Sequence, residues 1–170
     1  PKTPKPHEVL ILFIIGYGVR RGGKECWANR PSSKRNAAFT SFNKGDYEAA
    51  IPLYEACFMD AKTAHGDFSL DVLSSMDKLA ICYSETKDYD QAIRVNEERF
   101  MKMSLLYGDS YSPTLSALHS LGRDYVSRGD FGKALSAYED CLKKRCLALG
   151  ASHKSTMESR AAVYSLRTRL

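Results

Sequence analysis

One segment of the chain recurs three times at an exact spacing of 42 residues. The copies open with Gly45-Asp46-Tyr47, Lys87-Asp88-Tyr89 and Gly129-Asp130-Phe131, and an alanine follows at the same place in each copy: Ala50, Ala92 and Ala134. A fixed period between about 20 and 50 residues is typical of stacked structural repeats, in which each unit contacts its neighbours. The repeat therefore limits the fold to a row of similar units.

The residues within one period predict a pair of helices. The Asp of each opening is a good cap for the helix that follows it. In the third copy, apolar residues such as Ala134, Tyr138 and Leu142 are spaced as on one helix face, and Leu149-Gly150 should end that helix with a left-handed glycine. Ser112-Pro113 should start the other helix, as cap and first helical residue. That helix carries its apolar face at Leu115, Leu118, Leu121, Gly122 and Tyr125.

This helix hairpin resembles the tetratricopeptide repeat. A small residue four positions before an aromatic, as in Ala50 and Tyr54, is similar to its second-helix motif, and Leu121-Gly122 with Tyr125 is similar to its first-helix motif. The usual period is about 34 residues, and the excess of about eight residues equals about one turn on each helix. The longer, 42-residue repeat, together with the sequence of residues 137–150, resembles the repeats of the kinesin light chain class. The resemblance implies an all-α fold, a right-handed α–α superhelix (solenoid) of tetratricopeptide helix hairpins.

The pattern divides the chain into two regions. Residues 1–31 do not follow the repeat and are predicted to be an irregular or poorly ordered extension, and residues 32–170 form the repeat domain. The apolar run at residues 9–19 is about half the length of a membrane helix and has no cleavage pattern after it, which favours packing over targeting. Repeats are expected at about 32–66, 70–108 and 112–150, with a terminal helix at 155–169.

Residues 42 positions apart occupy equivalent places, or columns, in successive repeats, and four residues differ in character from the others in their column. Asn96 replaces the aromatic residue of repeat two, and Arg99 replaces the small residue found at Cys57 and Cys141, so we expect local loosening there. In the terminal helix, Arg160 and Arg167 take the places of Leu118 and Tyr125. Either that helix is rotated, or further repeats once followed it.

Charge and motifs argue against several classes of function. The net charge of +5 comes from residues 1–44, with nine Lys/Arg and two Asp/Glu, whereas residues 45–170 have sixteen and eighteen. The repeats therefore lack the excess of positive charge that is typical of nucleic-acid-binding domains. The five cysteines form no Cys-x-x-Cys pair and are expected to be packing residues in a reducing, cytoplasmic compartment. No phosphate-binding loop or metal-ligand motif is present, so we expect no enzyme activity, cofactor, metal or membrane partner.

The resemblance implies a scaffold or adaptor that binds an extended peptide of a partner protein in a concave groove. The family places that groove on the exposed positions of each first helix, which here carry apolar anchors beside charges of both signs. The corresponding residues are Arg35, Phe39, Phe42, Ser74, Asp77, Ile81, Ser84, Glu85, Ser116, His119, Arg123, Val126 and Ser127. The alternative is a regulatory or sensor repeat domain of a larger multidomain signalling protein or ATPase, which would bind a segment of the same chain.

Overall fold

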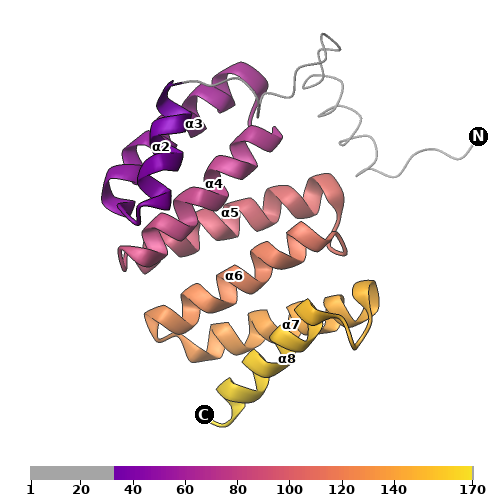
Figure 1. The fold of residues 1–170 in the computed structure, drawn as a ribbon. Coiled ribbons are helices and arrows are strands. Elements are labelled where there is room, and N and C mark those ends of the chain that lie inside the picture. The colour runs from indigo at the N-terminus through magenta and orange to yellow at the C-terminus, as the bar shows by residue number, and fades with distance from the viewer. Residues whose placement is uncertain (1–32, 170) are drawn as a thin grey trace, which may run out of the picture. The chain divides into compact units, whose positions relative to one another are not determined.

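The computed structural model describes residues 33–169, which form seven helices joined by turns, with no strand in that part of the chain (Figure 1). The prediction for residues 1–31 lies outside the described residues. The helices are α2 (Ser33–Asn43), α3 (Tyr47–His65), α4 (Leu70–Glu85), α5 (Tyr89–Tyr107), α6 (Ser112–Arg128), α7 (Phe131–Leu149) and α8 (Lys154–Arg167).

The repeated Asp caps the second helix of each pair, as predicted. Its carboxylate accepts a hydrogen bond from the backbone N–H three residues later, which satisfies one of the free donors at the helix start. The three pairs are Asp46 with Ala49 at 3.2 Å, Asp88 with Gln91 at 3.3 Å and Asp130 with Lys133 at 3.5 Å. The repeating sequence therefore fixes where α3, α5 and α7 begin.

Glycines with positive φ separate the repeats. Gly66, Gly108 and Gly150 have φ of 83°, 84° and 89°, as the predicted helix ends require, but their ψ values of 166°, 163° and 160° lie outside the left-handed helical region. That combination is accessible essentially to glycine alone. The turn inside each hairpin uses another column, in which Gly129 is left-handed helical and Lys87 adopts φ of 65°.

Two helix starts differ from the prediction by one residue. The helix α6 begins at Ser112, so Tyr111 takes the cap position without a side-chain hydrogen bond. The helix α8 begins at Lys154, and the side chain of His153 accepts a hydrogen bond from the Ser155 N–H at 3.2 Å. The assigned end of a helix commonly varies by one or two residues. A shift of one residue at the start does not change which residues lie on each face of the helix.

The described helices belong to two compact units, and the boundary between Ser75 and Met76 falls within α4. In the first unit α2 packs on α3, where Ala38 and Ala50 are fully buried. In the second unit α6 packs on α5, α7 on α6 and α8 on α7 (Figure 1). The core of the second unit consists of Ile93, Leu118, Leu121, Tyr125, Ala134, Tyr138, Cys141, Val163 and Leu166.

The closest approach in this core is between α6 and α7. A β-carbon built on Gly122 would lie 2.8 Å from Cε1 of the Tyr138 ring, so only glycine leaves room for that ring. Ala134, four residues earlier on α7, is fully buried in the same cluster. The small–aromatic motif, Ala134 and Tyr138, therefore packs the second helix of repeat three against α6.

We predict that Ala134→Glu lowers the free energy of unfolding by about 3–5 kcal/mol, because it places an unpaired charge in a filled core. Urea unfolding followed by circular dichroism measures the change. Ser136→Glu on the exposed side of α7 is the matched control and should change stability by less than about 0.5 kcal/mol. Equal stability of the two variants would contradict the packing of α7 described above.

Candidate peptide-binding face

The residues predicted to contact a peptide lie on the first helices of the hairpins, α2, α4 and α6. In the first unit, Phe39 is 54% exposed and Ser74 is exposed. Arg35 is half-buried, and its Nη2 lies 3.5 Å from Oδ1 of Asp71. Phe42 packs edge-on against two tyrosine rings, those of Tyr47 at 5.6 Å and Tyr54 at 6.1 Å between centroids. Phe42 therefore contributes to packing, whereas Phe39 is available at the surface.

In the second unit the predicted residues divide into an exposed set and a set used for internal contacts. The exposed set is Glu85 on α4 with Ser116, Arg123 and Ser127 on α6, and Ile81 and Val126 are half-buried. The three exposed residues of α6 are spaced seven and four apart, which places them along one helix face. We call these six residues the first-helix face. Asp77, Ser84 and His119 instead enter two polar clusters beneath it.

The first polar cluster surrounds Asp124, which is fully buried. Its Oδ2 accepts a hydrogen bond from Nδ2 of Asn96 at 2.6 Å, and its Oδ1 accepts one from Oγ of Ser84 at 3.1 Å. Nη1 of Arg99 donates to Oδ1 of Asn96 at 3.1 Å and lies 2.8 Å from Oδ1 of Asp77. The cluster thus joins α4, α5 and α6 through a chain of charged and amide groups.

Burial opposes the charged forms of this cluster. It raises the pKa of Asp124, and the hydrogen bonds from Asn96 and Ser84 counteract that rise. It also lowers the pKa of Arg99, against the attraction of Asp77 and Asp124. Buried charges of this kind are tolerated only when they are paired and hydrogen-bonded, and these are.

The expected loosening of repeat two is therefore wrong. Asn96 and Arg99, which break the apolar columns, are 1% and 8% exposed and find partners within the second unit. Sequence reasoning missed Asp124, although a signal was present. Asp124 stands where the preceding repeat has Cys82. Three buried positions therefore carry polar residues in the adjacent helices α5 and α6, although other repeats have apolar or small residues there. Such coincident exceptions indicate that the residues are partners.

The second polar cluster lies among α6, α7 and α8. Nη1 of Arg145, a residue only 3% exposed, donates to the backbone oxygen of Ser155 at 2.7 Å and to Oγ of Ser159 at 2.9 Å. Oγ of Ser159 is 3.3 Å from Nδ1 of His119, whose ring packs at a tilt of 55° against the Tyr138 ring, with 4.9 Å between the ring centroids. Burial, reinforced by the positive charges of Arg145 and Arg123 and opposed by Glu158, lowers the pKa of His119 to about 4. The imidazole is therefore neutral at neutral pH.

The thiol beside the second polar cluster is not a reactive one. The thiol of Cys141 lies 3.6 Å from Oγ of Ser159, but it donates to the backbone oxygen of Leu115 at 3.3 Å and burial raises its pKa. A buried, protonated thiol is a poor nucleophile. Among residues 33–169 no group of His, Cys, Asp or Glu side chains could hold a metal ion, and no helix is long and apolar enough to cross a membrane. Cys57, Cys82, Cys141 and Cys146 are free thiols.

Two family models described as tetratricopeptide repeat match the chain, one over residues 30–100 and one over residues 114–154. No curated protein matches it with comparable significance. The two matched segments together cover more than half of the sequence and overlap each of the three hairpins. The chain therefore belongs to the tetratricopeptide repeat family.

Solved structures show the same fold. The nearly identical TPR-like repeats of a putative kinesin light chain from Podosopora anserina align with a TM-score of 0.69 and 19% identity over 79% of this chain and 64% of that one. BtubC (BKLC) from P. vanneervenii aligns with a TM-score of 0.71 and 16% identity over 95% of this chain and 64% of that one. The chain thus spans slightly less than two thirds of these structures. The predicted fold class is confirmed: an all-α superhelix of tetratricopeptide hairpins of the kinesin light chain-like form.

The cluster around Asp124 makes a test by substitution possible, because the other repeats supply apolar or small residues for each position. We predict that Asp124→Cys, which copies Cys82, lowers the free energy of unfolding by about 2–4 kcal/mol, because Asn96 and Ser84 lose their buried acceptor and Arg99 loses a nearby negative charge. Adding Asn96→Tyr and Arg99→Cys, which copy Tyr138 and Cys141, should restore at least half of that loss. Urea unfolding of the single and triple variants measures both stabilities. If the triple variant is less stable than the single variant, Asp124, Asn96 and Arg99 are not energetically coupled.

The depressed pKa of His119 predicts a loss of stability in acid. An unfolded histidine has a pKa near 6.5, so between about pH 6.5 and 4 the unfolded chain binds a proton that the folded chain does not. Stability should therefore fall as pH is lowered from 7 to 5, by on the order of 1 kcal/mol, because solvent screens the partly exposed ring. Thermal unfolding at both pH values measures the fall, and His119→Gln should reduce it. An unchanged pH dependence in that variant would assign the effect to other groups.

Proposed function

We propose that this protein is a scaffold or adaptor whose first-helix face binds an extended peptide segment of a partner protein. The observation that supports the proposal most directly is the unused face of α6. Its opposite side is buried against α5 and α7, whereas Ser116, Arg123 and Ser127 remain exposed in one line. Arg123 forms no ion pair with any residue of the described part of the chain. An exposed, unpaired guanidinium on a packed helix suits recognition of a carboxylate.

The family and the polar clusters support the same function. Tetratricopeptide repeats form protein-interaction modules, and their fold presents a preformed surface rather than a catalytic centre. Beneath the face, Asp124 and His119 hold α6 to its neighbouring helices through hydrogen bonds. A surface that does not rearrange loses less entropy when a ligand binds.

The chemistry of the face indicates the kind of peptide. Ile81 and Val126 are half-buried and offer apolar contact, and Arg123 lies three residues before Val126 on the same helix. An extended segment with one Leu or aromatic anchor and flanking acidic residues complements this pattern. The anchor would contribute most of the affinity, and the charges would set orientation and association rate. We expect affinities of about a micromolar dissociation constant, because a free peptide is ordered on binding.

We predict that a peptide library screened against the protein returns acidic sequences, and that Arg123→Glu weakens their binding by about tenfold or more. Raising the salt concentration should weaken binding as well, because exposed charges are screened. Arg94→Glu, the same change at an exposed arginine on α5, is the matched control and should leave affinity unchanged. Binders that respond equally to the two substitutions, or to neither, would place the peptide site elsewhere.

A further inference from the structure

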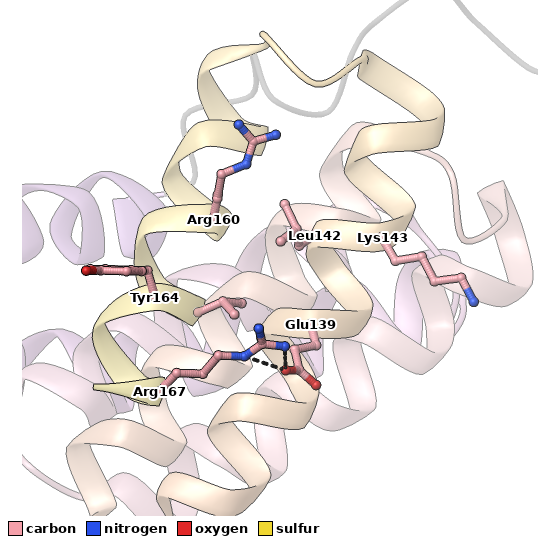
Figure 2. Close-up of a pocket in the computed structure, with 7 residues that line it drawn as sticks. Glu139, Leu142, Lys143, Arg160, Tyr164 and Arg167 are labelled. Carbon is pink, nitrogen blue, oxygen red and sulfur yellow. Dashed lines mark hydrogen bonds and ion pairs between the residues drawn. The ribbon is translucent and has the colours of Figure 1, made fainter. Parts of the chain in front are cut away.

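The buried arginine of the second polar cluster has no negative partner. Arg145 is 3% exposed, its Nη1 donates to two uncharged oxygen atoms of α8, and its Nε has no hydrogen-bond partner. No carboxylate in the described part of the chain pairs with it. Arg99, which is also buried, lies 2.8 Å from Oδ1 of Asp77. Even the exposed Arg167 is turned toward Glu139, with 2.6 Å between Nη2 and Oε1 (Figure 2). Because a buried charge without a counter-charge is unfavourable, the surroundings of Arg145 favour an anion from outside.

The charges around His119 leave a positive excess. Arg145 of α7 and Arg123 of α6 act on the ring with positive charge, and the exposed Glu158 of α8 acts with negative charge. Arg123 is exposed and has no ion pair with any residue that the structure describes. Tyr138 of α7, against which the ring packs, stays uncharged at neutral pH, because burial raises its pKa. One positive charge therefore remains uncompensated where α6, α7 and α8 meet.

The helix α8 brings Ser159 to His119 because it keeps the register of the first helices before it. Its buried residues correspond to buried residues of α6 at a distance of 42 positions: Thr156 to Thr114, Ser159 to Ala117 and Val163 to Leu121. The alternative of a rotated helix is therefore wrong. Repeat three has Ala117 where α8 has Ser159, so the hydroxyl group is a polar addition at an otherwise apolar contact.

The hydrogen bonds around Ser159 determine which nitrogen of neutral His119 carries the proton. Oγ of Ser159 accepts from Nη1 of Arg145 at 2.9 Å, and the Cys141 thiol donates to the backbone oxygen of Leu115. The Ser159 hydroxyl therefore has its own hydrogen available for Nδ1 of His119, 3.3 Å away. With Nδ1 as the acceptor, the neutral ring carries its proton on Nε2. Nε2 makes no hydrogen bond within the described part of the chain, so its N–H is available to a ligand.

The same cluster can accommodate a second proton on His119 without movement of a heavy atom. A charged imidazole donates through both nitrogens. Oγ of Ser159 then accepts from Nδ1 as well as from Arg145, and its hydrogen turns to Sγ of Cys141, 3.6 Å away. In the free protein, burial and the positive charges beside the ring hold the pKa of His119 at about 4. A carboxylate bound beside the ring would supply the missing negative charge and raise that pKa toward its ordinary value.

We propose that His119 and Arg123 together hold one carboxylate of the peptide bound at the first-helix face, and that His119 takes up a proton as this carboxylate binds. The two residues are four apart on α6, which places them on adjacent turns of one face. Arg123 pairs with the carboxylate from its exposed position, and the Nε2–H of the half-buried His119 donates to it. Arg145 is buried and acts through its charge alone. This assignment rests on the proposed function and adds its dependence on pH.

Uptake of a proton predicts stronger binding in mild acid. A bound carboxylate raises the pKa of His119 above its value of about 4 in the free protein, so between the two values the complex holds a proton that the free protein lacks. Affinity therefore rises as pH falls through this range. The carboxylates of the peptide ionise with a pKa near 4 and stay charged down to about pH 5. We expect the dissociation constant to decrease about threefold or more between pH 7 and pH 5.5.

The probe is a labelled acidic peptide from the library screen whose binding Arg123→Glu weakens, and fluorescence anisotropy with the full chain measures its affinity at both pH values. His119→Gln retains an N–H donor but cannot titrate, so this variant should bind at pH 7 and lose the gain in acid. His153→Gln, at an exposed histidine before α8, is the matched control and should keep the gain. Arg145→Met copies the buried Met103 of repeat two and removes a positive charge, so the gain should move to higher pH.

A second measurement follows the proton directly. The NMR chemical shifts of the imidazole nitrogens should titrate at a higher pH in the complex than in the free protein, and thermal unfolding at both pH values checks that each variant is folded. An affinity that depends on Arg123 but not on pH, or a gain in acid that persists in His119→Gln, would overturn this inference and leave the proposed function in place. Binders that ignore Arg123, or a screen without binders, would overturn both.

Discussion

The contact between Gly122 and Tyr138 is the constraint on which the third hairpin depends. The two helices approach until the tyrosine ring occupies the space that a β-carbon at position 122 would need. That approach buries Ala134 and Cys141 completely and brings the Cys141 thiol to the backbone oxygen of Leu115. Interiors are close-packed, so a larger residue at position 122 would force the Tyr138 ring or the helix that carries it to shift.

Most of the helical architecture could be predicted from the sequence because its signals are local and repeated. Asp46, Asp88 and Asp130 cap helices through hydrogen bonds to residues three positions away, and glycines end them through a backbone conformation that other residues rarely adopt. Each signal occurs three times, so an accidental match is easily recognised. The predicted helices consequently agree with the structure to within one or two residues at most ends.

The site was less predictable, because exposure depends on which residues far apart in the sequence meet. Asp77, Ser84 and His119 occupy first-helix positions that the family pattern assigns to a groove, yet Arg99, Asp124 and Ser159 bind them internally. A column that changes from apolar to polar gives no indication of its partner until the helices are packed. That the thirteen residues contact a peptide stays a prediction.

The buried polar cluster also gives the repeats an order. Columns of Ala, Leu and Tyr are nearly interchangeable, and an array built only from them could pair its hairpins out of sequence during folding. Asp124 belongs to the third hairpin, whereas Asn96 and Arg99 belong to the second, so the cluster is complete only when these two are neighbours. Deletion of the second hairpin by recombination would leave the buried carboxylate of Asp124 beside apolar residues. The boundary between the second and third hairpins therefore opposes the loss of the second repeat.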